Sequence, residues 1–209
     1  MFRIRPEVRA AIVTSLIVFL FGFLAGSANA ATTLQNLQAA FNGESNAHAR
    51  YLAFALQADK ETYGEVASLF RAAARAEEIH AANHAEVIKE IGATPEASIE
   101  TPQIRSTREN LEAAIKGESY ERDTMYPGFL RQARLDRNIH AVRTLNLART
   151  AEIEHAKLFT AALSNLERLK GTTGAIFYVC SVCGLTTREV NFSKCPSCFN
   201  SKEAFEKVT

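Results

Sequence analysis

The sequence contains no tryptophan and only five prolines and ten glycines among 209 residues, which excludes collagen-like and low-complexity chains. It also lacks a charge imbalance, because 24 Lys and Arg face 23 Asp and Glu, for a formal net charge of +1. This balance argues against a nucleic-acid-binding protein. Four cysteines are too few for a disulfide-rich scaffold of this length. All four lie among the last 30 residues, so their placement is more informative than their number.

Residues 1–30 have the pattern of an export signal. Arg3, Arg5 and Arg9 precede an apolar run over residues 10–25, and the small-x-small sequence Ala28-Asn29-Ala30 follows. The pattern predicts a signal peptide removed after Ala30 and an exported, periplasmic protein. The alternative is an uncleaved membrane anchor, although the run is shorter than the ~20 residues that span a bilayer.

Residues 31–170 contain four stretches in which apolar residues recur every three or four positions, as on the core-facing side of a helix. Ser106 and Glu109 form a capping box before the third stretch, and Pro127 is expected to kink or interrupt that helix. The connections are two short turns and one longer polar link over residues 92–102. The pattern predicts a mainly α protein with a ferritin-like four-helix bundle. The stretches cover residues 37–58, 66–91, 111–129 and 142–166.

Charged side chains interrupt these apolar stripes. Ionised carboxylates are rarely buried unless they are paired or bind metal, and no Lys or Arg lies on the stripes. If the core-facing positions were assigned one residue out of register, any single acid could lie in solvent. Such a shift explains five acids on four helices poorly. Five interior carboxylates repel one another and require cations. The residues are Glu44, Glu77, Glu118, Glu121 and Glu152, together with His80 and His155.

An internal duplication relates the two halves of the bundle. Glu77-x-x-His80 recurs as Glu152-x-x-His155, and Gly43-Glu44-Ser45 recurs as Gly117-Glu118-Ser119, at an offset of 74 or 75 residues. Residues three apart share one face of a helix, so a glutamate and a histidine at this spacing can bind one metal. Two such pairs predict a dinuclear iron or manganese site with bridging carboxylates.

The duplication breaks at Glu121, the third residue after Glu118, because the third residue after Glu44 is Ala47. One half of the site therefore has a spare carboxylate. His48, His84 and His140 lack the E-x-x-H partner. We expect His84 to bond His80 or to be partly exposed. Tyr51 and Tyr126 are expected near the carboxylates, as packed tyrosines with bonded hydroxyls or as redox relays.

Residues 171–209 hold a different kind of site. After a Gly-Thr-Thr-Gly linker and a strand-like stretch at 177–179 come Cys180-x-x-Cys183 and Cys195-x-x-Cys198. Paired CxxC knuckles indicate a tetrahedral thiolate site for iron or zinc. The alternative is two disulfides, since an exported chain meets oxidising conditions.

These motifs together resemble rubrerythrin over residues 32–209. The resemblance implies a di-iron bundle at 31–170 and a small rubredoxin-like β domain at 171–209 that holds one iron, with zinc as the alternative. The matching stretches are Phe41-x-Gly-Glu44-Ser with Arg50-Tyr51, Glu77-x-x-His80-Ala, Gly-Glu118-x-x-Glu121 with Met125-Tyr126-Pro127, Glu152-x-x-His155, and the cysteine knuckles with their CG and CP sequences.

The resemblance also implies an activity, the reduction of hydrogen peroxide to water with electrons from rubredoxin or a similar carrier. It implies head-to-tail dimers, in which one chain's rubredoxin-like iron lies near the other's di-iron site. Glu44 and Glu118 would be terminal ligands and Glu77 and Glu152 bridging ligands. His155 would bind the second iron, while His80 and Glu121 alternate on the first. The export signal departs from the familiar cytoplasmic members, which leaves the electron donor open.

Two other functions use the same residues. A ferroxidase-type iron-handling protein would oxidise Fe²⁺ at the bundle site. A non-enzymatic metal-binding bundle with a zinc ribbon would need no redox chemistry. The fused cysteine knuckles favour peroxide reduction, because iron storage requires a cage rather than an electron-delivering module.

Overall fold

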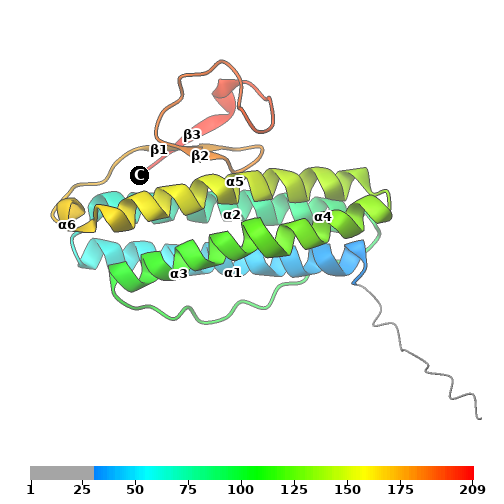
Figure 1. Cartoon of the computed structure of the whole chain (residues 1–209), viewed down its shortest axis with the longest axis horizontal. Coiled ribbons are helices and arrows are strands. Elements are labelled where there is room, and N and C mark those ends of the chain that lie inside the picture. Colours follow the sequence, from blue (N-terminus) through cyan, green and yellow to red (C-terminus); the bar gives the residue numbers. More distant parts are fainter. Residues whose placement is uncertain (1–30) are drawn as a thin grey trace, which may run out of the picture. The chain divides into compact units, whose positions relative to one another are not determined.

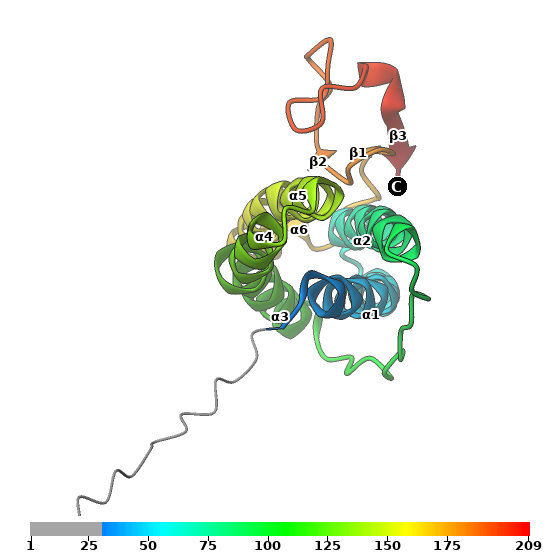
Figure 2. The ribbon, with the colours of Figure 1, turned by 90° about the vertical axis from the view of Figure 1, so that its right-hand side faces the viewer.

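The computed structural model describes residues 31–209, so the predicted signal peptide or anchor lies outside the described residues. α1, α2, α5 and the continuous run of α3, η1 and α4 lie side by side, which confirms the four-helix bundle (Figure 1 and Figure 2). Within residues 31–209, no helix combines the length and apolarity needed to cross a membrane. The helical elements are α1 (Thr33–Lys60), α2 (Gly64–Glu90), α3 (Thr107–Tyr120), the π-helical η1 (Glu121–Met125), α4 (Tyr126–Leu135), α5 (Ile139–Ser164) and α6 (Leu166–Leu169).

The long link between α2 and α3 runs along the outside of α1 (Figure 2). The side chain of Asn42 accepts the Ser98 N–H at 2.8 Å, and that of Asn46 accepts the Glu100 N–H at 2.8 Å. These bonds satisfy backbone groups that would otherwise depend on solvent. The link thereby crosses the bundle and starts α3 beside α1.

The capping box at Ser106 is confirmed, since its hydroxyl accepts the Glu109 N–H and the Glu109 carboxylate accepts the Ser106 N–H. The interruption expected at Pro127 takes the form of the π-helical segment η1. Pro127 has no N–H to donate to the preceding turn, and the Tyr126 N–H instead bonds to the Glu121 carbonyl five residues back. The chain therefore stays helical through a single wider turn.

Two apolar clusters fill opposite ends of the bundle. One contains Tyr51, Phe70 and Phe159, and the other contains Leu37 and Leu145. Burying each large apolar side chain contributes roughly 1.5–3 kcal/mol. The clusters leave the middle of the bundle to polar residues.

The C-terminal part, residues 171–209, is called the cysteine module below. Its sheet has the order β2-β1-β3, with β1 antiparallel to both neighbours. It packs on α2 and α5 (Figure 1), and Phe177 joins the core cluster of the bundle. The Arg75 guanidinium bonds to Glu206 at 2.8 Å across the junction. The elements are β1 (Phe177–Cys180), β2 (Thr186–Thr187), the 3₁₀ helix η2 (Lys202–Ala204) and β3 (Phe205–Val208).

Gly64, the first residue of α2, sets how closely the linker approaches the bundle. A Cβ at this position would lie 2.6 Å from the Thr172 carbonyl oxygen and 2.8 Å from the Thr173 carbonyl carbon. Both are backbone atoms, so relief requires moving the linker. We expect Gly64→Ala to lower the free energy of unfolding by about 1–3 kcal/mol, measured by chemical denaturation.

Gly43→Ala is the matched control, because a Cβ at Gly43 in α1 meets nothing within 4 Å. That substitution is expected to raise stability by roughly 0.5–1 kcal/mol, as alanine restricts the unfolded chain more than glycine does. Equal stability of the two variants would contradict the close approach.

Candidate metal centres

Each of the four helical segments of the bundle contributes one carboxylate to its middle. Glu44 lies on α1, Glu77 on α2, Glu118 on α3 and Glu152 on α5, and all four side chains are fully buried. The rings of His80 and His155 are buried with them. These six residues are called the carboxylate cluster below.

The carboxylate cluster divides into two overlapping groups. Within each group the potential ligand atoms lie within 4.8 Å of one another. Glu77 and Glu152 belong to both groups, so each can bridge two neighbouring positions. The groups are Glu44, Glu77, His80 and Glu152, and Glu77, Glu118, Glu152 and His155.

Both histidines direct Nδ1 toward the carboxylates. His80 Nδ1 lies 2.8 Å from Glu77 and 3.2 Å from Glu152, while His155 Nδ1 lies 2.9 Å from Glu152 and 3.3 Å from Glu77. The short distances follow from the i, i+3 spacing within each helix together with the packing of α2 against α5.

The cysteine module holds the other nitrogen of each ring. His80 Nε2 lies 3.1 Å from the Cys183 carbonyl oxygen, which only accepts, so Nε2 donates its proton there. The Thr186 hydroxyl donates to the Gly184 carbonyl and therefore accepts from His155 Nε2 at 3.0 Å. Because each Nε2 keeps its proton, each Nδ1 can act as a metal ligand.

Several buried atoms of the cluster lie close to one another but make no hydrogen bond of acceptable geometry among residues 31–209. They are Glu44 Oε2, Glu77 Oε1, Glu118 Oε2, both Glu152 carboxylate oxygens and His155 Nδ1. A buried unsatisfied polar atom costs roughly 1–3 kcal/mol, and more when it is charged. Two cations bound between these oxygen and nitrogen atoms would give them partners. A ligand set that is rich in carboxylate oxygens and contains two imidazoles suits iron or manganese. The residues present therefore fit a dinuclear metal site.

In the protein without metal, the pKa values of the cluster are shifted so that protons neutralise part of its negative charge. Burial, reinforced by Glu77, raises the pKa of Glu118 to about 7. Burial and the Glu77 carboxylate also raise the pKa of Glu44. Burial opposes ionisation of His80, but the adjacent Glu152 and Glu77 carboxylates outweigh it and raise the pKa of His80 to about 10. Protonated acids and imidazolium thus take over part of the charge balance that metals would provide.

Glu121 lies outside both groups. It begins the π-helical segment, is only partly exposed, and has its pKa raised by burial and by the nearby Glu44. The spare carboxylate inferred from the duplication is therefore next to the cluster rather than within it. Its position at the wider turn fits the common occurrence of π-segments at functional sites.

The two tyrosines are related by the duplication and make equivalent contacts. The Tyr51 hydroxyl donates to Glu118, and the Tyr126 hydroxyl donates to Glu44. Both are fully buried, as expected for packed tyrosines with bonded hydroxyls.

The remaining histidines differ from one another. His48 Nδ1 donates to the Ala74 carbonyl at 2.7 Å, and the exposed His140 pairs with Glu90 at 2.6 Å. The prediction that His84 bonds His80 or is partly exposed is wrong. His84 is fully buried, and its ring nitrogens face Tyr126 and Thr144.

The four cysteines of the cysteine module are free thiols gathered around one point. Cys180 Sγ lies 3.7 Å from Cys198 Sγ, and Cys183 Sγ lies 3.7 Å from Cys195 Sγ. A tetrahedron with metal–sulfur bonds of about 2.3 Å has an edge of about 3.8 Å, so the spacing matches a thiolate metal site. The hydrogen bond from Cys183 lowers the pKa of Cys180 to about 5, while the same bond and burial raise the pKa of Cys183, so that Cys180 is the thiolate of this pair in the absence of metal.

The two sites meet within one chain. Beyond the His80–Cys183 bond, the Asn83 side chain donates to the Val182 carbonyl at 3.0 Å. Gly184, with a φ of +74°, permits this approach, because a Cβ there would collide with the His80 ring. The resemblance implied such proximity between two chains of a dimer. Here it is present inside a single chain, and the dimer stays a prediction.

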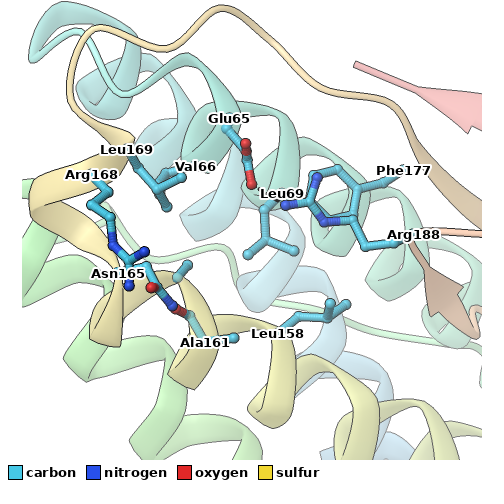
Figure 3. A pocket seen from close by; sticks show the side chains of 11 residues that line it. Glu65, Val66, Leu69, Leu158, Ala161, Asn165, Arg168, Leu169, Phe177 and Arg188 are labelled. Atoms are coloured by element: carbon cyan, nitrogen blue, oxygen red, sulfur yellow. Dashed lines mark hydrogen bonds and ion pairs between the residues drawn. The ribbon is translucent and has the colours of Figure 1, made fainter.

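A pocket of about 300 Å³ lies near the start of α2, between α2, α5, α6 and the sheet (Figure 3). Arg188 stacks on Phe177 at 4.5 Å and forms an ion pair with Glu65 from α2. The lining contains neither histidine nor cysteine. The pocket is therefore a seam where the cysteine module is attached to the bundle.

The fold and the carboxylate cluster define the class of ferritin-like proteins with a carboxylate-bridged dinuclear metal site. The rubrerythrin family model matches residues 35–163. Nigerythrin of Nitratidesulfovibrio vulgaris is 36% identical over 95% of this chain and 98% of its own length. Rubrerythrin-2 of Clostridium acetobutylicum is 38% identical over 84% of this chain and 96% of its own length.

A solved structure of nigerythrin in its fully reduced, all-ferrous state superposes with a TM-score of 0.78. It is 35% identical and covers 97% of this chain and 100% of that one. The chain belongs to the rubrerythrin family. It carries the carboxylate and histidine set of a di-iron site and a four-cysteine metal knuckle.

Removing the metals should make stability depend on pH in a defined direction. The pKa of Glu118 is raised from 4.5 to about 7 and that of His80 from 6.5 to about 10. At these two groups the folded state binds protons more tightly than the unfolded state, and this stabilisation is lost as pH rises. The lowered pKa of His84 acts in the opposite direction below about pH 6.5, but Glu44 and Glu121, whose pKa values are also raised, outnumber it. We expect the free energy of unfolding of chelator-treated protein to fall between about pH 4.5 and 10.

Glu118→Gln removes one of these titrating groups and should flatten the lower part of that decline. Urea denaturation at several pH values, with and without bound metal, measures it. Metal-free stability that rises over the same range would contradict the assignment of raised pKa values.

Proposed function

We propose that the chain is an oxidoreductase of the rubrerythrin type, a non-haem di-iron peroxidase that reduces hydrogen peroxide to water. The observation that carries the proposal is the bond from His80 Nε2 to the Cys183 carbonyl. It joins a residue of the carboxylate cluster directly to the backbone of a cysteine knuckle. This contact supports the proposal, because a module that transfers single electrons would act directly beside a site suited to two-electron chemistry.

In this proposal the carboxylate cluster holds two irons. Glu77 and Glu152, which belong to both ligand groups, would be shared by the two irons, Glu44 and Glu118 would each bind one of them, and His80 and His155 would supply Nδ1. The four cysteines hold a third iron, for which zinc is the redox-inactive alternative. The all-ferrous state described for nigerythrin supports iron in this family. When bound, the iron pair supplies two electrons to peroxide and the thiolate iron restores them one at a time.

The chain's own residues hold the ligands in place and keep water out. Tyr51 and Tyr126 each donate a hydrogen bond to a terminal carboxylate, which fixes one oxygen and leaves the other directed inward. The apolar clusters at both ends restrict the access of solvent to the carboxylate cluster. The balance is H₂O₂ + 2H⁺ + 2e⁻ → 2H₂O, so the site needs two protons as well as two electrons.

The electrons must come from outside the chain. We propose a reduced rubredoxin or a similar carrier protein as the donor. The Cys198 side chain is only partly buried, so one edge of the thiolate site faces the surface where a carrier can approach.

Anaerobically reduced protein should be oxidised by peroxide at both sites, followed by stopped-flow visible absorption of the ferric thiolate and of the ferric iron pair. Protein with zinc in the thiolate site and iron in the bundle is the matched control. It should still react once with peroxide but should not be re-reduced by reduced rubredoxin. Failure of peroxide to oxidise the bundle iron, with rapid oxidation and retention of added Fe²⁺, would instead establish the ferroxidase alternative.

Glu121 is proposed as a ligand that exchanges with His80 when the site is oxidised, because added positive charge favours an anionic oxygen. Glu121→Ala should retain both bundle irons in the reduced state but lose at least about tenfold in peroxide turnover. Asp123→Ala, which removes an exposed acid from the same segment, should behave as wild type. Wild-type turnover with full iron content in Glu121→Ala would exclude the exchange.

A further inference from the structure

The two repeats that build the site differ in the residues that surround Tyr51 and Tyr126. Tyr51 and Tyr126 correspond at an offset of 75 residues, and both bond a terminal carboxylate. At the same offset, however, His84 corresponds to Phe159. Thr144 likewise corresponds to Leu69. One half of the bundle therefore has polar residues where the other has apolar ones.

In the polar half, hydrogen bonds continue outward from the cluster. The Tyr126 hydroxyl, which donates to Glu44, lies 3.2 Å from His84 Nε2. His84 Nδ1 in turn lies 2.9 Å from Thr144 Oγ1. Tyr126 and His84 are fully buried, and Thr144 is 6% exposed. The row thus begins at a proposed metal ligand and ends where solvent first reaches a side chain.

In the apolar half, the equivalent row stops at once. The Tyr51 ring lies 5.4 Å from Phe159 and 5.9 Å from Phe70, measured between ring centroids. Within residues 31–209, the hydrogen-bond partner of the Tyr51 hydroxyl is Glu118. Its surroundings provide no onward acceptor or donor in the described part of the chain, so a proton at Tyr51 has no comparable exit.

The polar row opens into a pocket of about 280 Å³ between α2 and α5. Thr144 lines this pocket together with Glu86, Glu90 and His140, whose side chains are exposed and exchange protons with water. The pocket is separate from the seam of Figure 3, which has a different lining.

We propose that Tyr126, His84 and Thr144 form a proton path from this pocket to the Glu44 side of the cluster. The proposal rests on the function proposed above, because peroxide reduction consumes two protons in a site that excludes water. The path supplies protons only. The two electrons come from the reduced iron pair, each iron going from Fe²⁺ to Fe³⁺.

Each transfer can be written at a stated atom. Thr144 Oγ1 passes its proton to His84 Nδ1 and regains one from water in the pocket. His84 Nε2 passes its proton to the Tyr126 oxygen, and the Tyr126 hydroxyl passes its own to Glu44 Oε1. Hydroxyls and a neutral imidazole suit this role, because each has both a donor and an acceptor. Every member of the path ends neutral, and His84 has exchanged one tautomer for the other, so the ring must return to its first tautomer before the second proton follows.

Burial and the nearby His80 lower the pKa of His84 to about 3. The ring is therefore neutral under ordinary conditions, which leaves one nitrogen free to accept. The rival account is that His84 only packs against Tyr126 and positions it. The two accounts differ in one respect. If His84 only positions Tyr126, a side chain that keeps the hydrogen bonds but cannot shuttle a proton should sustain proton uptake at the wild-type rate.

Three variants of the iron-loaded full chain separate the accounts. His84→Phe copies the residue of the other half, His84→Gln keeps hydrogen-bonding groups without a facile proton shuttle, and Thr144→Val removes the outer hydroxyl at nearly constant volume. The matched control is Thr160→Val on the same helix, since the Thr160 hydroxyl bonds the Ala156 carbonyl. Iron content and the visible spectrum establish that each site is intact.

The first readout is proton uptake during one reaction of reduced protein with peroxide, followed with a pH indicator in a stopped-flow instrument. All three path variants should take up protons at least about tenfold more slowly than wild type, while Thr160→Val is unchanged. Proton uptake at the wild-type rate in His84→Gln would mean that the residue only positions Tyr126. The same result in Thr144→Val would mean that protons do not enter through Thr144. Either result overturns the proposal.

The second readout needs no peroxide. Infrared difference spectra of protein cycled electrochemically between its oxidised and reduced states, with ¹⁵N-labelled histidine, should show an imidazole tautomer signal that His84→Phe and Thr144→Val abolish. If the wild type fails to reduce peroxide but gives this signal, the proposed function fails and the path stands. If the wild type reduces peroxide without it, the path fails and the function stands.

Discussion

The structure depends on a cluster of buried carboxylates that the protein alone cannot neutralise. Four helices each place one glutamate at the midline, and several of their oxygens have no hydrogen-bond partner among the described residues. Apolar packing at both ends forces these groups to stay inside. The resulting repulsion between buried carboxylates favours the binding of metal cations at this site. Two cations would neutralise these carboxylates and turn their mutual repulsion into a stabilising interaction.

The cysteine module completes the site in the bundle by holding its two histidines. It accepts a hydrogen bond from His80 Nε2 at the Cys183 carbonyl and one from His155 Nε2 at the Thr186 hydroxyl, so that both Nδ1 atoms face the carboxylates. Ligands oriented in this way bind metal with less loss of conformational freedom. The approach requires Gly184, because any side chain there would meet the His80 ring. These two contacts would couple metal binding in the bundle to folding of the module.

Much of this was predictable from sequence, since spacing alone reveals which side chains share a helix face. The stripes, the E-x-x-H pairs and the paired cysteine knuckles predicted the fold and indicated the clusters. The path of the linker was not predictable, because it depends on how Thr172 and Thr173 pack on Gly64. The row through His84 was missed for a different reason. A lone polar residue on an apolar face looks like ordinary packing, and only its replacement by Phe159 in the other half marks it as different.

Mössbauer spectroscopy of the fully iron-loaded chain tests the central claim most directly. The reduced protein should show ferrous iron with oxygen and nitrogen ligands at twice the area of a tetrahedral ferrous thiolate signal. After enough peroxide to take one electron from each iron, both signals should become ferric, the larger as a spin-coupled pair. Oxygen-ligated iron that is absent, uncoupled or still ferrous after peroxide would contradict a carboxylate-bridged di-iron peroxidase.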